Sequence, residues 1–180
     1  MISFEEQAYE VMRDDEWRTS QFIRAIEQRL DGKDGKPIVL DISTGPFALL
    51  ALAAARAGAK HVHAIEVNPK AAAAAAEAIK QAKASGAVPR GLVTVHQGLS
   101  TAIELDVKVD LVVAEIIGSV ASEEALHATV RDAQARLIAR PHDPASYIPV
   151  RAQTIAAPAS YYLHTRGSTA GKTSRRSMRA

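Results

Sequence analysis

The amino-acid sequence predicts an α/β domain with a doubly wound, Rossmann-like parallel sheet and helices on both of its faces. Two observations lead to this prediction. Short runs of β-branched and apolar residues, typical of strands covered on both faces, alternate with helical segments rich in alanine and leucine. Acidic residues stand where predicted strands end, at the edge where such sheets bind ligands. The chain has 180 residues, of which 47% are hydrophobic, which suits one globular domain with its own core.

The first predicted elements are a helix and the strand that follows it. Apolar residues recur at helical spacing over Glu16–Leu30, and a typical stop signal, Asp31-Gly32, follows. We expect Trp17 and Phe22 to pack this helix against the core. A polar linker, residues 31–37, then leads into Ile38–Ile42, a short β-branched run typical of a buried strand.

Two helices and a second strand come next. We predict a Leu/Ala-rich helix from Phe47 to Ala57 and a strand from His61 to Glu66. Asn68 is a suitable N-cap, and Pro69 fits the first position of a helix. The alanine-rich run that follows predicts a helix to about Ala84, because alanine is the strongest helix former.

The alternation continues through the second half of the chain. We predict three more strands and one more helix, namely strands Leu92–His96, Val109–Ala114 and Tyr147–Ala157 and a helix from Ser122 to about Ala139. Ser122 would cap this helix, and Glu123 and Glu124 would lie in its first turn, where the helix dipole favours anions.

Composition excludes several classes of function. The chain has no cysteine, which rules out disulfides, thiolate metal sites and cysteine nucleophiles. The N-terminal residues have no apolar core, and no run approaches the length of a membrane span, so we expect neither a secretory signal nor a membrane partner. We expect a cytoplasmic and/or nuclear protein. Basic residues concentrate after Thr165, and the remaining chain is slightly acidic, so nucleic-acid binding is not expected.

The bend after the first strand, residues 41–47, argues against a dinucleotide cofactor. A pyrophosphate site needs several glycines so that backbone N–H groups can approach the phosphates. This bend has one glycine, Gly45, while Pro46 removes an N–H donor and Phe47 adds bulk. S-adenosylmethionine carries no phosphate, and Glu66, 21 residues after Gly45, is placed to accept hydrogen bonds from both ribose hydroxyls. The sequence therefore favours S-adenosylmethionine, with an NAD-dependent dehydrogenase as a distant alternative.

Asp41 and Ser43 belong to the same predicted cofactor site, because they lie at the end of the first strand and in the bend after it. Each acid also has a simpler interpretation. Asp41 could cap the following helix, and Glu66 could be an exposed acid beside a helix start. We predict three segments: an N-terminal helical segment over 1–36, the S-adenosylmethionine-binding domain over 37–163, and a basic, disordered tail over 164–180.

Three segments of the chain resemble motifs of the protein arginine methyltransferases. Val39–Glu66 resembles the family's VLD-x-G-x-G-x-G … AGA-x-x-V-x-x-x-E segment. Tyr9–Arg18 resembles its Y/H-x-x-M-L-x-D-x-x-R helix. Ala114–Glu124 resembles its double-E hairpin, whose two glutamates are nine residues apart, as are Glu115 and Glu124.

The resemblance implies the class I methyltransferase fold and a set of roles. Arg18 is expected to meet the methionyl carboxylate of the cofactor, and Ser100 and Thr101 to lie near its adenine ring. Glu115 and Glu124 are expected to be catalytic, and two carboxylates suit a guanidinium, whose planar fork pairs bidentately with them. The implied partners are a protein substrate with arginine side chains and another subunit in a homo- or hetero-oligomer.

The sequence also departs from that family. Ser43 and Phe47 replace the first and third loop glycines, and the family's C-terminal β-barrel has no counterpart here. These departures motivate a second hypothesis, a catalytically inactive homologue with a regulatory or scaffolding role. A methyltransferase for a small molecule or an RNA base is a third, although the N/D-P-P-Y signature of amine-modifying enzymes is absent. His61 and His63 share one strand face, yet no third ligand lies nearby, so no metal site is predicted.

Overall fold

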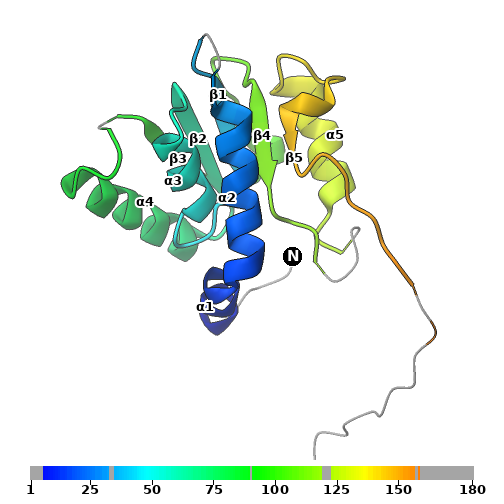
Figure 1. The fold of residues 1–180 in the computed structure, drawn as a ribbon, viewed down its shortest axis with the longest axis horizontal. Coiled ribbons are helices and arrows are strands. Elements are labelled where there is room, and N and C mark those ends of the chain that lie inside the picture. The colour runs from blue at the N-terminus through cyan, green and yellow to red at the C-terminus, as the bar shows by residue number, and fades with distance from the viewer. Residues whose placement is uncertain (1–5, 33–34, 90, 119–122, 157, 159–180) are drawn as a thin grey trace, which may run out of the picture.

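The fold is built around a five-stranded parallel sheet with the strand order β3-β2-β1-β4-β5 (Figure 1). The structure, a computed structural model, describes residues 6–32, 35–89, 91–118, 123–156 and 158. The strands are β1 (Ile38–Ile42), β2 (His61–Glu66), β3 (Val93–Gln97), β4 (Leu111–Ala114) and β5 (Tyr147–Ile148). The helices are α1 (Glu6–Asp14), α2 (Glu16–Leu30), α3 (Leu49–Arg56), α4 (Pro69–Ala84) and α5 (Leu126–Arg136), with 3₁₀ turns η1 (Ser100–Ala102) and η2 (Pro144–Ser146).

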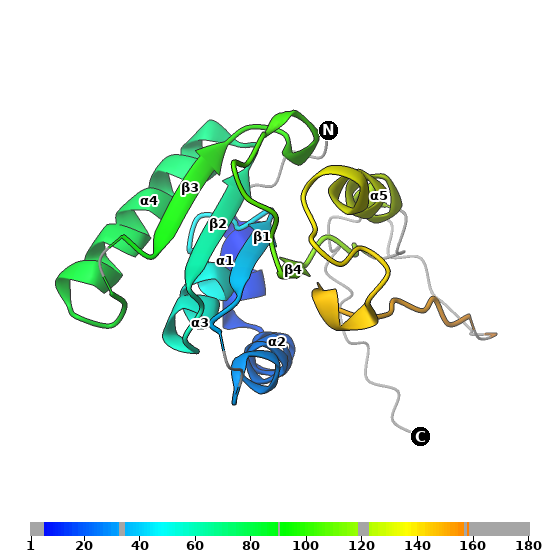
Figure 2. The same cartoon turned by 90° about the horizontal axis from the view of Figure 1, so that it is seen from above.

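Helices cover both faces of the sheet, as Figure 2 shows: α2, α3 and α4 lie on one side and α5 on the other. The alternation of side chains along the strands produces two cores. Val39 packs into the core under α2–α4, whereas its neighbour Leu40 packs into the core under α5. Both side chains are fully buried, which explains why β1 reads as a continuous apolar run.

The strand order reverses at β1, which pairs with β2 on one side and with β4 on the other. Asp41 near the end of β1 stands in register with Ala64 of β2 and with Val113 of β4. The loops that leave these three parallel strands therefore emerge together at one edge of the sheet. This is the switch point at which open α/β sheets bind their ligands.

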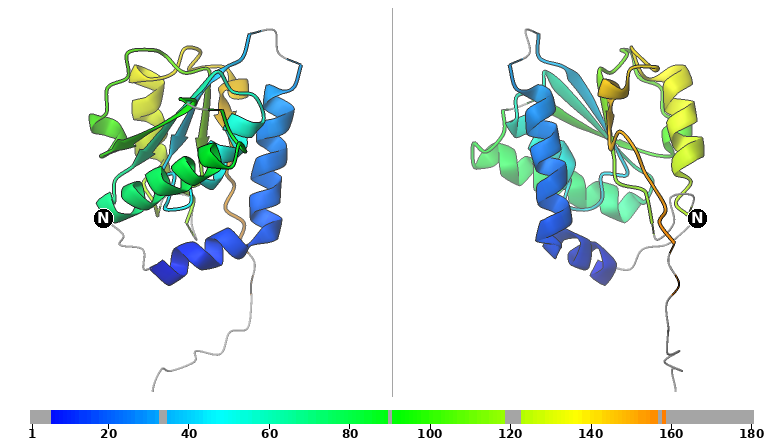
Figure 3. Two further views of the ribbon diagram at one scale, coloured as in Figure 1. Left: turned by 90° about the vertical axis from the view of Figure 1, so that its left-hand side faces the viewer. Right: turned by 45° about the vertical axis from the view of Figure 1, so that its right-hand side comes forward.

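The N-terminal helices bring a further wall to that edge. Asp15 separates α1 from α2 and caps α2, because its carboxylate accepts the backbone N–H of Arg18 at 3.0 Å. Figure 3 shows α1 turned away from the axis of α2, so that the two helices are not continuous. Tyr9 and Met12 of α1 thereby face the loop after β1. If Gly45 carried a Cβ atom, that atom would lie 3.7 Å from the ring of Tyr9.

The structure confirms the predicted fold class and the order of its elements, but two helices begin later than predicted. α3 begins at Leu49 and α5 at Leu126. In both cases an alanine with left-handed backbone precedes the helix, Ala48 with φ 47° and Ala125 with φ 60°. Left-handed backbone interrupts a right-handed helix, so neither helix can extend further back.

Consequently Glu123 and Glu124 lie in a turn before α5 and not in its first turn, and the predicted cap Ser122 lies outside the described residues. The fifth strand is also shorter than predicted. It ends at Ile148 because Pro149 follows, and proline has no N–H for a sheet ladder. The predicted tail over 164–180 lies outside the described residues.

Trp17 does not pack against the core, contrary to the prediction, and is 78% exposed. It lies nine residues before the fully buried Ile26. Nine residues are about two and a half helical turns, which places the two side chains on opposite faces of α2. Phe22, four residues before Ile26, is on the core side and packs there as predicted. Within the described residues, no helix has both the length and the apolar character needed to cross a membrane.

Candidate functional site

Two neighbouring cavities lie at the carboxyl edge of the sheet, and Ser43 and Glu124 line both of them. We call them the helix-side cavity and the sheet-edge cavity. The helix-side cavity is lined among others by Tyr9, Met12, Arg18, Gly45, Glu66 and Glu115. The sheet-edge cavity is lined among others by Ile65, Val67, Leu99, Ser100, Ile116 and Thr129, and its volume is about 400 Å³. That volume is within the usual range of small-molecule sites.

Glu66 ends β2 at the floor of the helix-side cavity and is only 2% exposed. One of its oxygens accepts the N–H of Gly45 at 3.0 Å, and the other accepts the N–H of Asn68 at 2.9 Å. These bonds fix the carboxylate on the loop after β1 and on the start of α4. A carboxylate has about four acceptor sites, so each oxygen retains capacity for one more donor. Two vicinal hydroxyls are donors of the kind that this arrangement can accept.

The loop after β1 offers no nest of free N–H groups. Thr44 donates its N–H to the carbonyl of Ile65 at 3.0 Å, and Gly45 donates its N–H to Glu66. Pro46 has no N–H. A phosphate at this loop would therefore meet three successive residues without a free donor, which agrees with the prediction of a cofactor without phosphate.

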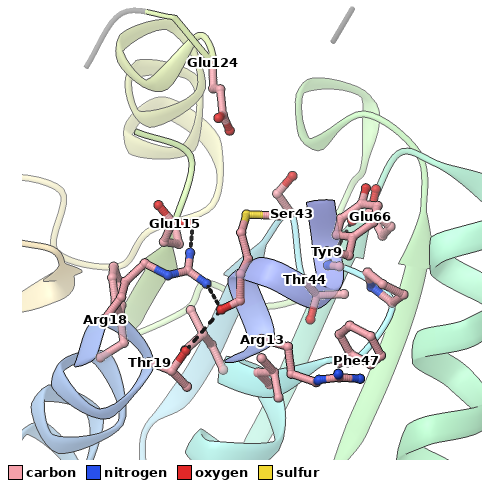
Figure 4. Close-up of a pocket in the computed structure, with 16 residues that line it drawn as sticks. Tyr9, Arg13, Arg18, Thr19, Ser43, Thr44, Phe47, Glu66, Glu115 and Glu124 are labelled. Carbon is pink, nitrogen blue, oxygen red and sulfur yellow. Dashed lines mark hydrogen bonds and ion pairs between the residues drawn. The ribbon is translucent and has the colours of Figure 1, made fainter. Parts of the chain in front are cut away.

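The loop keeps its path although it has lost two glycines of the family motif. Ser43 adopts φ 65° and Gly45 φ 67°, both in the left-handed region. At the third glycine position, Phe47 does not close the cavity but forms part of its wall, with the guanidinium of Arg13 4.8 Å from its ring centre. Figure 4 shows this pair at one side of the cavity, away from Glu115 and Glu124.

Asp41 is one of two predicted site residues that line neither cavity, and Thr101 is the other. Its side chain is 1% exposed and accepts the hydroxyl hydrogen of Thr44 at 2.6 Å. Burial raises the pKa of Asp41 to about 6, and the nearby charge of Glu66 adds to the increase, while hydrogen bonds from Thr44 and the backbone of Ala51 oppose it. Asp41 therefore binds the loop through Thr44 and the start of α3 through Ala51. This position is closer to the alternative interpretation, in which Asp41 caps the following helix.

Arg18 and Glu115 form an ion pair inside the helix-side cavity (Figure 4). The second terminal nitrogen of Arg18 donates to the carbonyl of Met12 at 2.6 Å, which ties the guanidinium to the end of α1. Nε of Arg18 is buried without a hydrogen-bond partner, with the nearest Asp15 oxygen at 3.9 Å. These bonds use two of the five N–H groups of the guanidinium, and the unpartnered Nε is among the remaining donors.

Glu115 and Glu124 line the same cavity from the residue after β4 and from the turn before α5. Burial raises the pKa of Glu124, and the charges of Glu115 and Glu123 raise it further. Burial also raises the pKa of the Tyr9 hydroxyl, to which the charges of Glu66 and Glu124 contribute. These shared influences show that the acidic groups form one local electrostatic unit, which favours a cationic ligand.

Of the two residues predicted near the adenine ring, Ser100 lines the sheet-edge cavity, whereas Thr101 is exposed and does not. The apolar side chains of this cavity come from the ends of three strands and from the turn after β3. Val67, Leu99 and Ile116 give this cavity apolar walls of the kind against which aromatic groups pack. Sequence reasoning missed Leu99 and Ile116, although they lie only three and two residues after the predicted strand ends His96 and Ala114.

The histidines of β2 and β3 form a separate cluster. Nδ1 of His63 lies 3.0 Å from Nε2 of His96, and the ring of His61 is 4.6 Å from that of His63. Burial lowers the pKa of His63 to about 4, and the charges of the other two histidines contribute. Within the described part of the chain, no group of three or more His, Cys, Asp or Glu side chains could hold a metal ion.

Comparisons with known proteins agree with the geometry. The family model of the ribosomal protein L11 methyltransferase (PrmA) matches residues 17–135, about two thirds of the chain. Protein arginine methyltransferase 10 of Arabidopsis thaliana matches with 26% identity over 75% of this chain and a TM-score of 0.61. A chain of the PRMT1 enzyme–prozyme heterotetrameric complex of Trypanosoma brucei with AdoHcy matches with 27% identity over 75% of this chain and a TM-score of 0.60.

The matched region spans 36% of the Arabidopsis chain and 39% of the trypanosome chain. The comparison with curated proteins gave no significant match. A methyltransferase family model and a solved relative in complex with AdoHcy together imply S-adenosylmethionine as the cofactor. The chain belongs to the ribosomal protein L11 methyltransferase (PrmA) family, and its fold is the class I S-adenosylmethionine-dependent methyltransferase fold of the protein arginine methyltransferases.

Proposed function

We propose that this protein transfers a methyl group from S-adenosylmethionine to the guanidinium of an arginine side chain in a protein substrate. The observation that carries the proposal is the ion pair of Arg18 with Glu115 in a cavity that Glu124 also lines. The cavity thus already accommodates a guanidinium beside two carboxylates. A planar fork of donors pairs with carboxylates more specifically than a lysine ammonium does.

The residues of the crevice fit the cofactor. Glu66 would accept the ribose hydroxyls through its remaining lone pairs. The cofactor has no phosphate, so it would not need free N–H groups at Thr44, Gly45 and Pro46. Val67, Leu99 and Ile116 would hold the adenine ring in the sheet-edge cavity. Arg18, whose Nε is buried and unpaired, would bind the carboxylate of the methionyl group.

The cofactor supplies an electrophilic methyl group on a sulfonium, and the protein supplies position and charge. Glu115 would orient the target guanidinium once Arg18 turns toward the cofactor carboxylate. Glu124, with its raised pKa, is the better of the two glutamates to accept the proton that the attacking nitrogen loses. In this scheme catalysis comes mainly from alignment and from the negative field of the glutamates.

A regulatory or scaffolding role is the second candidate. The trypanosome relative belongs to an enzyme–prozyme heterotetramer, which makes a hetero-oligomeric partner for this chain a reasonable proposal. The local features that favour it are Ser43 and Phe47, because they put side chains in the lining of the helix-side cavity where the family motif has glycines. A scaffold of this kind would bind the cofactor without turning it over, alone or with its partner.

Labelled methyl transfer separates these candidates. The protein would be incubated with methyl-labelled S-adenosylmethionine and an Arg/Gly-rich peptide, a Lys/Gly-rich peptide of the same length, or ribosomal protein L11. Transfer to the arginine peptide alone, reduced at least about 100-fold by Glu115→Gln, supports the proposal. Transfer to L11 or to the lysine peptide instead would reassign the substrate, and binding without transfer would support the scaffold.

Cofactor choice has its own measurement. S-adenosylhomocysteine at about 100 times its dissociation constant should add roughly 2.7 kcal/mol of stability, which a thermal-shift titration detects readily. NAD at the same concentration should leave the midpoint unchanged, because Thr44 and Gly45 have no free N–H for its phosphates. Stabilisation by NAD alone would contradict the assignment of the crevice.

A further inference from the structure

Arg136 lies in the last turn of α5, outside the linings of both cavities, and every donor of its guanidinium is used. Nε and Nη2 donate to the carboxylate of Asp132 at 2.9 and 2.6 Å. Nη2 also donates to the carbonyl of Ser100 at 2.8 Å. Nη1 donates to the carbonyl of Ile103 at 3.0 Å and to the carboxylate of Glu104 at 3.1 Å. A guanidinium has five N–H groups, and five acceptor contacts saturate it.

These contacts join two walls of the sheet-edge cavity. Ser100 and its neighbour Leu99 line the cavity from the turn after β3, and Thr129 lines it from α5. Arg136 holds the carbonyls at the two ends of η1, while Asp132, one helical turn earlier on α5, fixes the arginine side chain. Arg136 therefore links the η1 wall to α5, beside the packing of Ile103 against the core under α5.

Within the described residues, the η1 turn has few other hydrogen bonds to α5. Its backbone bonds are internal, from Ala102 and Ile103 to the carbonyl of Leu99 at 2.9 and 3.1 Å. Leu99 itself is 50% exposed, so packing alone does not fix it. A turn of this kind is positioned by the groups that hold its carbonyls, which here belong to Arg136.

We infer that Arg136 is a positioning residue for the nucleoside half of the cofactor, because it sets the position of the η1 wall against which a purine would pack. The inference rests on the proposed use of the sheet-edge cavity for adenosine. Arg136 touches neither the cofactor nor the reacting atoms. Lysine could not replace it, since an ammonium cannot span two carbonyls and two carboxylates in one plane.

The test is isothermal titration of S-adenosylhomocysteine and of adenosine into the wild type, Arg136→Met, Arg136→Lys and the control Arg131→Met. Arg131 is an exposed arginine on the same helix and lines neither cavity of the crevice. The melting temperature of each variant is measured first, and titrations are made at a temperature at which every variant is fully folded. We expect both Arg136 variants to bind both ligands about tenfold or more weakly, and Arg131→Met to bind within twofold of the wild type.

The outcomes separate a positioning role from a structural one. If Arg136→Met melts earlier but binds both ligands like the wild type, the arginine only stabilises the fold and the inference is wrong. If the wild type itself does not bind S-adenosylhomocysteine, the proposed function fails first. Should Arg136→Met not fold, Asp132→Asn takes its place, because it removes the charge that orients Arg136 while leaving the guanidinium present. Weaker binding by this variant supports the inference, and unchanged binding refutes it.

Discussion

Arg18 and Glu115 are 97 positions apart in the sequence, yet their side chains pair in the crevice between α2 and the end of β4. The pair brings the group expected to bind the cofactor into contact with a group expected to bind the substrate. Both proposed ligands must therefore compete with this ion pair. The carboxylate of the cofactor competes with Glu115 for Arg18, and the target guanidinium competes with Arg18 for Glu115. Cofactor binding should thus prepare Glu115 for its substrate, because it draws Arg18 away.

Replacing Arg18 by methionine should weaken cofactor binding in a manner that depends on the cofactor's carboxylate. A charge-assisted hydrogen bond contributes about 1.5–3 kcal/mol, so the dissociation constant of S-adenosylhomocysteine should rise roughly 10- to 100-fold. Adenosine lacks the carboxylate and should bind within twofold of the wild type. Titration calorimetry with both ligands measures the difference, and Arg24→Met, an exposed arginine on the same helix, is the control. Equal losses for both ligands would mean that Arg18 supports the fold and not the carboxylate.

Replacing Glu66 by glutamine should reduce affinity for both S-adenosylhomocysteine and adenosine by about 10- to 100-fold. The glutamine amide has only one acceptor oxygen. The backbone N–H of either Gly45 or Asn68 therefore loses its acceptor, and so does one hydroxyl of the ribose. The control is Glu77→Gln, a change at an exposed glutamate on α4 that pairs with Lys80. Unaltered affinity for adenosine in the Glu66 variant would show that another group binds the ribose.

Replacing Ser43 by glycine should raise stability. Left-handed backbone costs a residue with a side chain about 1–2 kcal/mol, while glycine adds conformational freedom to the unfolded chain that offsets about half of the gain. We therefore expect an increase of up to about 1 kcal/mol in the free energy of unfolding, seen as a melting temperature a few degrees higher. Ser20→Gly, within α2, should instead lower stability by roughly the same amount. A melting temperature that falls in both variants would contradict the strained geometry at Ser43.

Replacing Asp41 by asparagine should change how stability depends on pH. The folded-state pKa of about 6 lies above the ordinary value of 3.8, so the folded protein binds a proton more tightly than the unfolded chain does. The wild type is then favoured at pH 4 and loses that advantage as the pH rises through 6, by about 3 kcal/mol in total. Urea unfolding from pH 4 to 8 should show the variant gaining on the wild type over this window. A constant difference between the two proteins would indicate that Asp41 titrates normally.

The sequence was sufficient for the elements and for most of the residues at the crevice. Periodicity and turn residues gave the helices and strands in order, and an acid or a small residue at the end of each central strand identified Glu66, Gly45 and Glu115 as neighbours at one sheet edge. The predicted starts of α3 and α5 were wrong because Ala48 and Ala125 adopt left-handed backbone. Alanine is a strong helix former, so its presence does not indicate such a conformation.

What only the tertiary structure decided is where side chains of known type point and which distant groups they meet. Asp41 and Glu66 lie on the same face of the sheet, because Asp41 is in register with Ala64 and Glu66 follows two residues later. Asp41 nevertheless binds Thr44 under the loop, whereas Glu66 lines the cavity. The bonds of Arg136 to carbonyls of a turn more than thirty residues earlier have no local signal, although its pairing with Asp132 four residues before it does. Local propensity is a property of neighbours in the chain, whereas such contacts form only after the sheet has brought separate segments together.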